Sequence, residues 1–94
     1  MTYAVVSVHS PRAEHREAVL DSMKRYSKVA RGQPGFVWTG IVDDDASGRL
    51  VGIAVWESAS AAQAASGPLM AEVGDDPFTT WDEQPIDGLR GCVL

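Results

Sequence analysis

Two apolar segments on either side of an acidic turn place the strongest constraint on the fold. Residues Phe36–Val42 and Leu50–Glu57 are rich in β-branched and aromatic side chains, as strands are. Between them, the sequence "DDDASG" supplies turn residues, and Gly48 suits a positive φ. The segments therefore predict a β-hairpin. Apolar residues stand at both odd and even positions, so both faces of this hairpin must be covered.

The chain before the hairpin predicts one strand and one helix. Tyr3–Val8 is β-rich, and Ser10 is a suitable N-cap for a helix from Pro11 to about Arg31. Gly32 is a suitable C-cap. Residues at three- and four-residue spacing form one face of this helix: His15, Val19, Met23, Tyr26 and Ala30.

The chain after the hairpin predicts a second helix and a last strand. Ser58 caps a helix over 59–66, Gly67 and Pro68 break or kink it, and 69–73 are able to continue it. Residues 74–88 read as polar and irregular, and 89–94 as a short strand. The resulting order β-α-β-β-α-β predicts an α+β, ferredoxin-like single domain over residues 1–94, with two helices on one face of an antiparallel sheet. A second copy of the chain is the economical cover for the other face, so we expect a homodimer.

The hairpin also predicts empty volume beside large rings. If Val42 lies opposite Leu50, one face carries only β-branched residues such as Val37 and Val51. The other face then alternates large with small: Phe36, Trp38, Val42, Leu50 and Trp56 with Gly40, Gly52 and Ala54. That volume must be filled by a flat aromatic ligand, by the first helix or by the partner subunit.

Composition excludes several classes of function. The net charge is −5, and Arg90 is the only base after residue 50, which disfavours nucleic acid as a partner. The single cysteine, Cys92, allows no internal disulfide. No segment approaches the ~20 apolar residues of a membrane helix, and the N-terminus lacks the features of a signal peptide. We expect a cytoplasmic protein that binds neither membrane nor nucleic acid.

The motifs "PGF" at 34–36 and "WES" at 56–58 follow an amphipathic helix and a hairpin, respectively. In this order, they resemble the antibiotic biosynthesis monooxygenase domain family over about Tyr3 to Val73. The resemblance implies a dimeric α/β barrel with a pocket between sheet and helices. Some members oxidise polycyclic aromatic polyketides with O₂, using neither metal nor flavin, so no cofactor is expected.

The chain departs from that pattern at two positions. The polyketide-oxidising members share the Trp of "WES", here Trp56, but carry an Asn and a Tyr where this chain has Gly52 and Ala62. A haem-degrading branch of the family uses an Asn on strand one, a Trp near the position of Ala65 and a later His, all absent here. The sequence neither supports nor excludes a third branch of the family, whose members act on small signalling molecules.

Five residues are candidates for a site, and each also has a purely structural interpretation. His9 and His15 are candidate catalytic bases, since imidazole transfers protons near neutral pH. The alternatives are a strand-end histidine bonded to backbone and a histidine that caps the core. Trp38, Trp56 and Tyr26 are candidate walls of a substrate pocket or plain core residues. No His or Cys spacing predicts a metal site.

Two functions from different classes follow. The first is a cofactor-independent monooxygenase that oxidises a small or polycyclic aromatic substrate with O₂ in secondary metabolism. The alternative is a non-catalytic, small-ligand-binding or stress-associated dimeric α/β barrel, which Gly52 and Ala62 favour.

Overall fold

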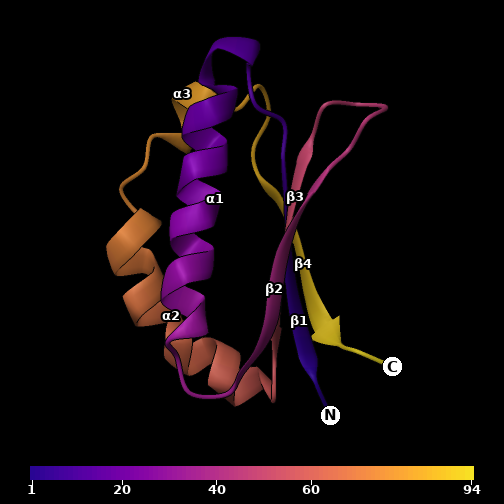
Figure 1. Cartoon of the computed structure of the whole chain (residues 1–94), viewed down its shortest axis with the longest axis vertical. Helices are drawn as coiled ribbons and strands as arrows, with labels where there is room; N and C mark the ends of the chain where they lie inside the picture. The colour runs from indigo at the N-terminus through magenta and orange to yellow at the C-terminus, as the bar shows by residue number, and fades with distance from the viewer.

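The predicted ferredoxin-like order is present in the structure. The computed structural model describes all residues, Met1–Leu94. Its antiparallel sheet has the strand order β2-β3-β1-β4, and α1 and α2 cover one face (Figure 1). The elements are β1 (Tyr3–His9), the 3₁₀ turn η1 (Ala13–His15), α1 (Arg16–Arg31), β2 (Phe36–Asp43), β3 (Leu50–Trp56), α2 (Ala59–Val73), α3 (Phe78–Trp81) and β4 (Asp87–Cys92).

The first helix begins later than the sequence predicts, for a reason that matters to the site. Ser10 does not cap it, because the backbone of residues 10–12 pairs with a distant segment instead. The Ser10 carbonyl accepts from the Glu83 N–H at 2.8 Å, and the Arg12 N–H donates to the Trp81 carbonyl at 2.8 Å. Residues 81–83, predicted to be irregular, are thereby fixed beside the end of β1.

The second helix begins as predicted and continues through Pro68. The Ser58 hydroxyl accepts from the Ala61 N–H, which satisfies one of the free donors at the helix start. The helix then runs to Val73 without ending at Gly67 or Pro68. Its buried residues recur at spacings of three and four and face the sheet and α1: Ala62, Ala65, Leu69 and Val73.

The hairpin register is one residue away from the predicted one. Val42 lies opposite Val51, Asp43 opposite Leu50, and a bulge between Phe36 and Trp38 restores the pairing of Phe36 with Trp56. The predicted partition of side chains therefore holds for β3 but is wrong for β2 from Trp38 to Val42, because a one-residue slip moves each side chain to the other face. Trp56 faces the helices and is 1 % exposed, whereas Trp38 points to the opposite face and is 52 % exposed.

The gap at Gly40 is filled by the chain itself. A Cβ at Gly40 would lie 2.5 Å from the Trp38 ring, so that ring covers the glycine on the outer face of the sheet. The glycine at position 40 therefore makes room for the Trp38 indole. No space for a ligand is left at this point on the outer face of the sheet.

The core consists of two apolar clusters between the sheet and the helices. One is built around Trp56, whose ring meets that of Phe36 edge-on at 5.9 Å. The other contains Val19, Met23 and Leu50, with Trp81 packed against it. Thus Trp81 of α3 anchors the chain after α2 to the core.

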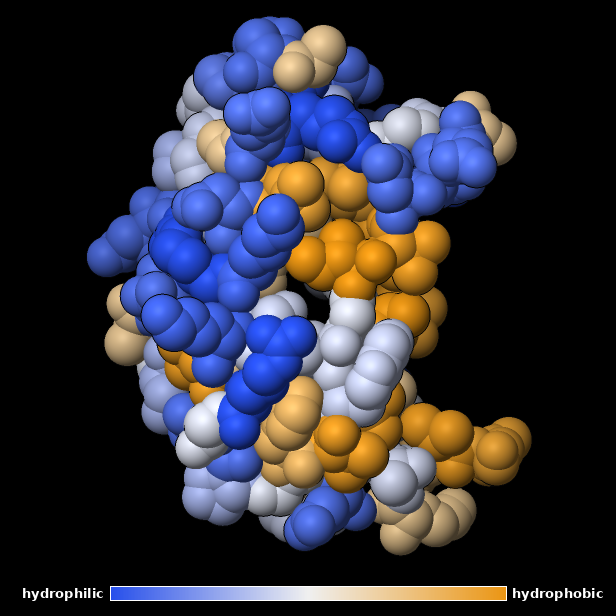
Figure 2. All heavy atoms as spheres, viewed as in Figure 1, coloured by the Kyte–Doolittle hydropathy of each residue, from blue (hydrophilic) through white to orange (hydrophobic).

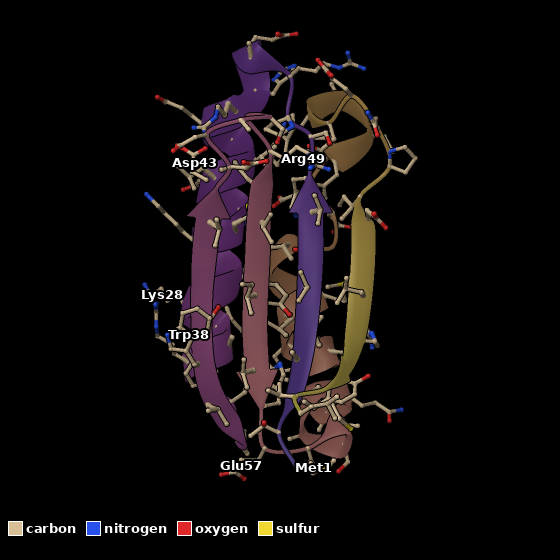
Figure 3. All side chains as sticks on the ribbon, turned by 90° about the vertical axis from the view of Figure 1, so that its right-hand side faces the viewer. Met1, Lys28, Trp38, Asp43, Arg49 and Glu57 are labelled. Atoms are coloured by element: carbon tan, nitrogen blue, oxygen red, sulfur yellow. The ribbon has the colours of Figure 1, made fainter.

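The sheet face away from the helices is apolar and uncovered. We call it the open sheet face and define it by Trp38, Val42, Val51, Ile53, Val55 and Leu89. Figure 2 shows hydrophobic residues gathered along the sheet side, and Figure 3 looks onto this face, with Trp38 at its β2 edge. No helix in the chain has the length and apolar character needed to traverse a bilayer.

Candidate functional site

A cavity lies between the sheet and the helices and contacts both core clusters. Its volume is about 230 Å³, and its walls come from all four strands and all three α-helices. Figure 2 shows the hollow between the hydrophilic helix layer and the hydrophobic sheet. Most of the lining is apolar, and His9, Tyr26 and Arg90 bring the ionisable groups. This is the usual character of a small-molecule site: mostly apolar, with a few polar groups.

One end of the cavity contains a buried histidine–carboxylate pair. His9, the last residue of β1, is 5 % exposed, and its Nδ1 lies 3.2 Å from Oδ2 of Asp82. The Asp82 side chain is 1 % exposed, and its other oxygen, Oδ1, has no hydrogen-bond partner. Because Nδ1 is engaged by the carboxylate, Nε2 is the ring nitrogen left for a molecule in the cavity.

The segment after α2 holds Asp82 in place. The backbone bonds of Ser10 and Arg12 fix residues 81–83, and the Asp82 N–H donates to the Phe78 carbonyl at 2.8 Å. The Phe78 ring lies 5.4 Å from the His9 ring and also lines the cavity. The short helix α3 therefore supplies an aromatic contact, and the residue after it a carboxylate, to the same imidazole.

Hydrogen bonds from α1 fix the start of the segment that follows α2. Asp76 accepts from the Ser22 hydroxyl at 2.6 Å and from Arg25 Nη2 at 2.7 Å. Arg25 also binds Asp21 one helical turn earlier. These contacts fix the end of α2, where Val73 lines the cavity.

The other end of the cavity carries a phenol and a guanidinium. Tyr26 of α1 is partly buried, and its burial raises the pKa of the phenol, an effect that the positive charge of Arg90 partly offsets. The Tyr26 hydroxyl thus stays protonated at neutral pH and is able to donate a hydrogen bond. Arg90 of β4 pairs in register with Val5 and lines the cavity.

The raised pKa of Tyr26 predicts a loss of stability in alkali. Above about pH 10 the unfolded chain ionises this phenol while the folded chain keeps its proton, so the free energy of unfolding falls as pH rises. We expect Tyr26→Phe to reduce this fall, measured by urea denaturation at pH 8 and pH 10.5. Equal losses of unfolding free energy in the two proteins between these pH values would show that Tyr26 is not the group responsible.

The structure brings together some of the predicted site residues. His9 and Tyr26 line the main cavity. Trp56 lines an adjoining cavity of about 150 Å³, which shares Tyr26 and Arg90 with the first. His15 lies on η1 outside both cavities, and Trp38 lies on the open sheet face because of the register difference.

Sequence reasoning missed Asp82, Phe78 and Arg90. Asp82 and Phe78 fall in the stretch that reads as irregular, and no spacing connects Asp82 to a histidine 73 residues earlier. The one available signal was Trp81, an aromatic residue within a polar stretch, which predicts an anchored segment. No group of three or more His, Cys, Asp or Glu side chains is placed to hold a metal ion.

Fold and site together define a class: a ferredoxin-like α+β protein with a ligand-sized cavity between its sheet and helices. The sequence matches the family described as "Antibiotic biosynthesis monooxygenase" over residues 1–67. The chain belongs to that family. No curated protein sequence matches significantly.

Solved structures with the same fold cover almost the whole chain. Rv0793 from Mycobacterium tuberculosis has a TM-score of 0.86 and 17% identity, with 100% of this chain and 96% of that chain covered. A mutant of SnoaB, a cofactor-independent oxygenase from Streptomyces nogalater, has a TM-score of 0.74 and 18% identity, covering 98% and 92%. A conserved protein from Methanosarcina mazei has a TM-score of 0.83 and 8% identity, covering 97% and 91%. At these identities, the likeness concerns the fold.

Proposed function

We propose that the protein is a cofactor-independent monooxygenase that oxidises a hydroxylated aromatic substrate with O₂. The observation that carries this proposal is the buried His9–Asp82 pair at the end of an otherwise apolar cavity. A carboxylate on Nδ1 keeps that nitrogen protonated, which leaves Nε2 as a proton acceptor. Family membership and the likeness to SnoaB support the same reaction class.

The proposed reaction begins with removal of a proton from the substrate by His9 Nε2. For an anthrone-type substrate, the electron-rich anion forms a carbon–oxygen bond with O₂, which is reduced to the level of a peroxide. Loss of the second C–H proton and cleavage of the O–O bond give a C=O group and water. The substrate supplies all four electrons, one oxygen atom enters the product, and the protonated His9 returns its proton to the departing oxygen.

The remaining residues of the cavity provide binding and polarity in this scheme. Apolar walls reduce the contact of the anion with water, and the Tyr26 and Ser7 hydroxyls are available as hydrogen-bond donors to a developing oxyanion. Ser7 lies beside Gly52, since a Cβ at Gly52 would be 2.9 Å from Ser7 Oγ. Gly52 occupies the position at which the polyketide-oxidising members carry an Asn, whose amide donor this chain lacks. Ser7 is thus in place to substitute for that donor.

Oxygen uptake tests this function. With anthrone or a dihydroxynaphthalene, without flavin and in the presence of EDTA, we expect O₂ consumption and quinone formation in equal amounts, faster than in buffer. Rates equal to those in buffer for every substrate, together with measurable binding, would contradict catalysis and favour the second candidate.

The second candidate is a small-ligand-binding protein without catalysis. The observation that favours it lies again at Gly52, where a Cβ would be 3.1 Å from Cε of Met23. An asparagine side chain at this position would have to displace the Met23 methyl group and the Ser7 hydroxyl. The cavity then keeps its apolar walls but lacks the amide donor implied by the family resemblance.

We propose that the open sheet face is the interface of a homodimer. This face is apolar across the sheet from Trp38 on β2 to Leu89 on β4, and Trp38 at its edge leaves half of its surface exposed. Large exposed apolar patches mark interaction sites, and a self-complementary face is suited to a two-fold dimer. The family resemblance implies the same arrangement, in which the helices and the cavity stay on the outside.

A further inference from the structure

We infer that the substrate is a compact, two-ring hydroxyaromatic acid, held with its acidic group at Arg90 and its hydroxyl at His9. The inference rests on the proposed function in taking this cavity as the substrate site. It adds the size, charge and orientation of the ligand, which neither the family nor the reaction class fixes. Charge, spacing and volume each support it.

Arg90 is the only permanently charged side chain in the cavity lining. It forms no ion pair within the chain, since the salt bridges involve His9, Arg16, Arg25 and Arg49. It also lines the adjoining cavity, so it lies where the two hollows meet. Arg90 is an exposed residue, and its unpaired guanidinium beside apolar walls favours a ligand with a carboxylate, which its planar fork binds through two hydrogen bonds.

The spacing of the two polar ends sets the length of the ligand. Arg90 lies opposite Val5 on β1, and His9 lies four residues further along that strand. At about 3.3 Å per residue, the two backbone positions are about 13 Å apart. If both side chains turn toward a ligand in the cavity that they line, the gap left between their nitrogen atoms fits two fused rings with polar groups at opposite ends. A single ring leaves one end without a partner.

The cavity volume limits the ring count. The hollow of about 230 Å³ exceeds the ~150 Å³ of a cavity that holds one benzene, and it falls below the ~300 Å³ at which sites for drug-sized ligands begin. Beside Gly52 the space is already occupied by the Met23 methyl group and the Ser7 hydroxyl, so the cavity does not extend further at that point. The main cavity therefore fits two rings better than the three or four of a polycyclic substrate, with the acidic group at the junction with the adjoining cavity.

Binding measurements test the inference separately from catalysis. The probes are 6-hydroxy-2-naphthoate, its neutral methyl ester and anthrone, titrated calorimetrically in the absence of O₂. We expect the acid to bind about tenfold more tightly than the ester, as a partly exposed charge-assisted contact allows. Arg90→Gln should remove this preference. Arg49→Gln, in the hairpin turn and outside the lining of both cavities (Figure 3), should keep it.

The outcomes separate this inference from the proposed function. Equal binding of acid and ester by the unmodified protein overturns the inference, as does a preference that survives Arg90→Gln or tighter binding of anthrone. If anthrone is oxidised while the acid shows no preference, the inference fails and the proposed function stands. If the acid is preferred through Arg90 but no probe is oxidised in air, the ligand class stands and the monooxygenase proposal fails.

Discussion

Replacing His9 with glutamine is expected to lower kcat for aromatic oxidation by about 10²–10⁴-fold, the usual contribution of a general base. Glutamine keeps a polar side chain at the end of β1 but cannot accept a proton at neutral pH. The effect should appear in kcat more than in KM, because the apolar walls that bind the rings are unchanged. Oxygen uptake under saturating substrate measures it.

His15→Gln is the matched control. His15 lies on η1, outside both cavities, and so its replacement should change kcat less than twofold. The two variants distinguish the two histidines that the sequence offers as bases. Full activity in the His9 variant, or a large loss in the His15 variant, would contradict the assignment.

Asp82→Asn addresses the role of the carboxylate as a positioning residue. An asparagine amide that donates to Nδ1 moves the ring proton to Nε2, so His9 loses its acceptor toward the cavity. We expect a rate loss approaching that of the His9 variant, together with a tautomer change visible in ¹⁵N NMR spectra of the imidazole. A purely structural role would lower stability and leave the tautomer unchanged.

Replacing Trp38 with lysine is expected to convert a dimer into a monomer. Trp38 is 52 % exposed at the edge of the open sheet face, and a dimer through this face would bury it twice, once in each protomer. A Trp that acts as an interface hot spot is worth about 2 kcal/mol or more, so the loss of both copies should raise the dissociation constant by about 10³-fold. A lysine adds the cost of burying a charge.

Sedimentation at micromolar concentration measures this effect. The unmodified protein should have twice the 10.1 kDa mass of one chain, and Trp38→Lys should have the mass of one chain with unchanged secondary structure. Trp38→Phe is the conservative control and should stay dimeric. A monomeric unmodified protein, or a dimeric lysine variant, would show that the open sheet face is not the interface.

The element order was predictable because local signals agree with the fold. The acidic turn, the Ser58 cap and the β-rich Tyr3–Val8 segment are read from neighbouring residues, and the structure keeps all three. The hairpin register was not predictable, because the bulge between Phe36 and Trp38 leaves no mark in the alternation of apolar residues. That single bulge decides that Trp38 faces outward while Trp56 faces the helices.

Half of the candidate site escaped prediction for a different reason. Tyr26 shares one face of the first helix with Val19 and Met23, so its orientation toward the sheet followed from the spacing, whereas the alternation in β1 did not fix the face of His9. Asp82 reaches His9 only through backbone pairing of residues 10–12 with 81–83, a long-range contact that competes with the local signal for a helix start at Ser10. The residues around Ser10 carry no information on whether the helix cap or the distant backbone pairing is the more stable arrangement.

The most direct measurement of the central claim is a ligand titration followed by NMR of the His9 imidazole. With 6-hydroxy-2-naphthoate under nitrogen, we predict saturable shifts of the Nε2 resonance of His9 and of Tyr26, with Asp82→Asn abolishing the Nε2 response. The claim is that substrate binds between sheet and helices against the His9–Asp82 pair. Shifts confined to the open sheet face, for example at Val42, with His9 unaffected at saturation, would contradict it.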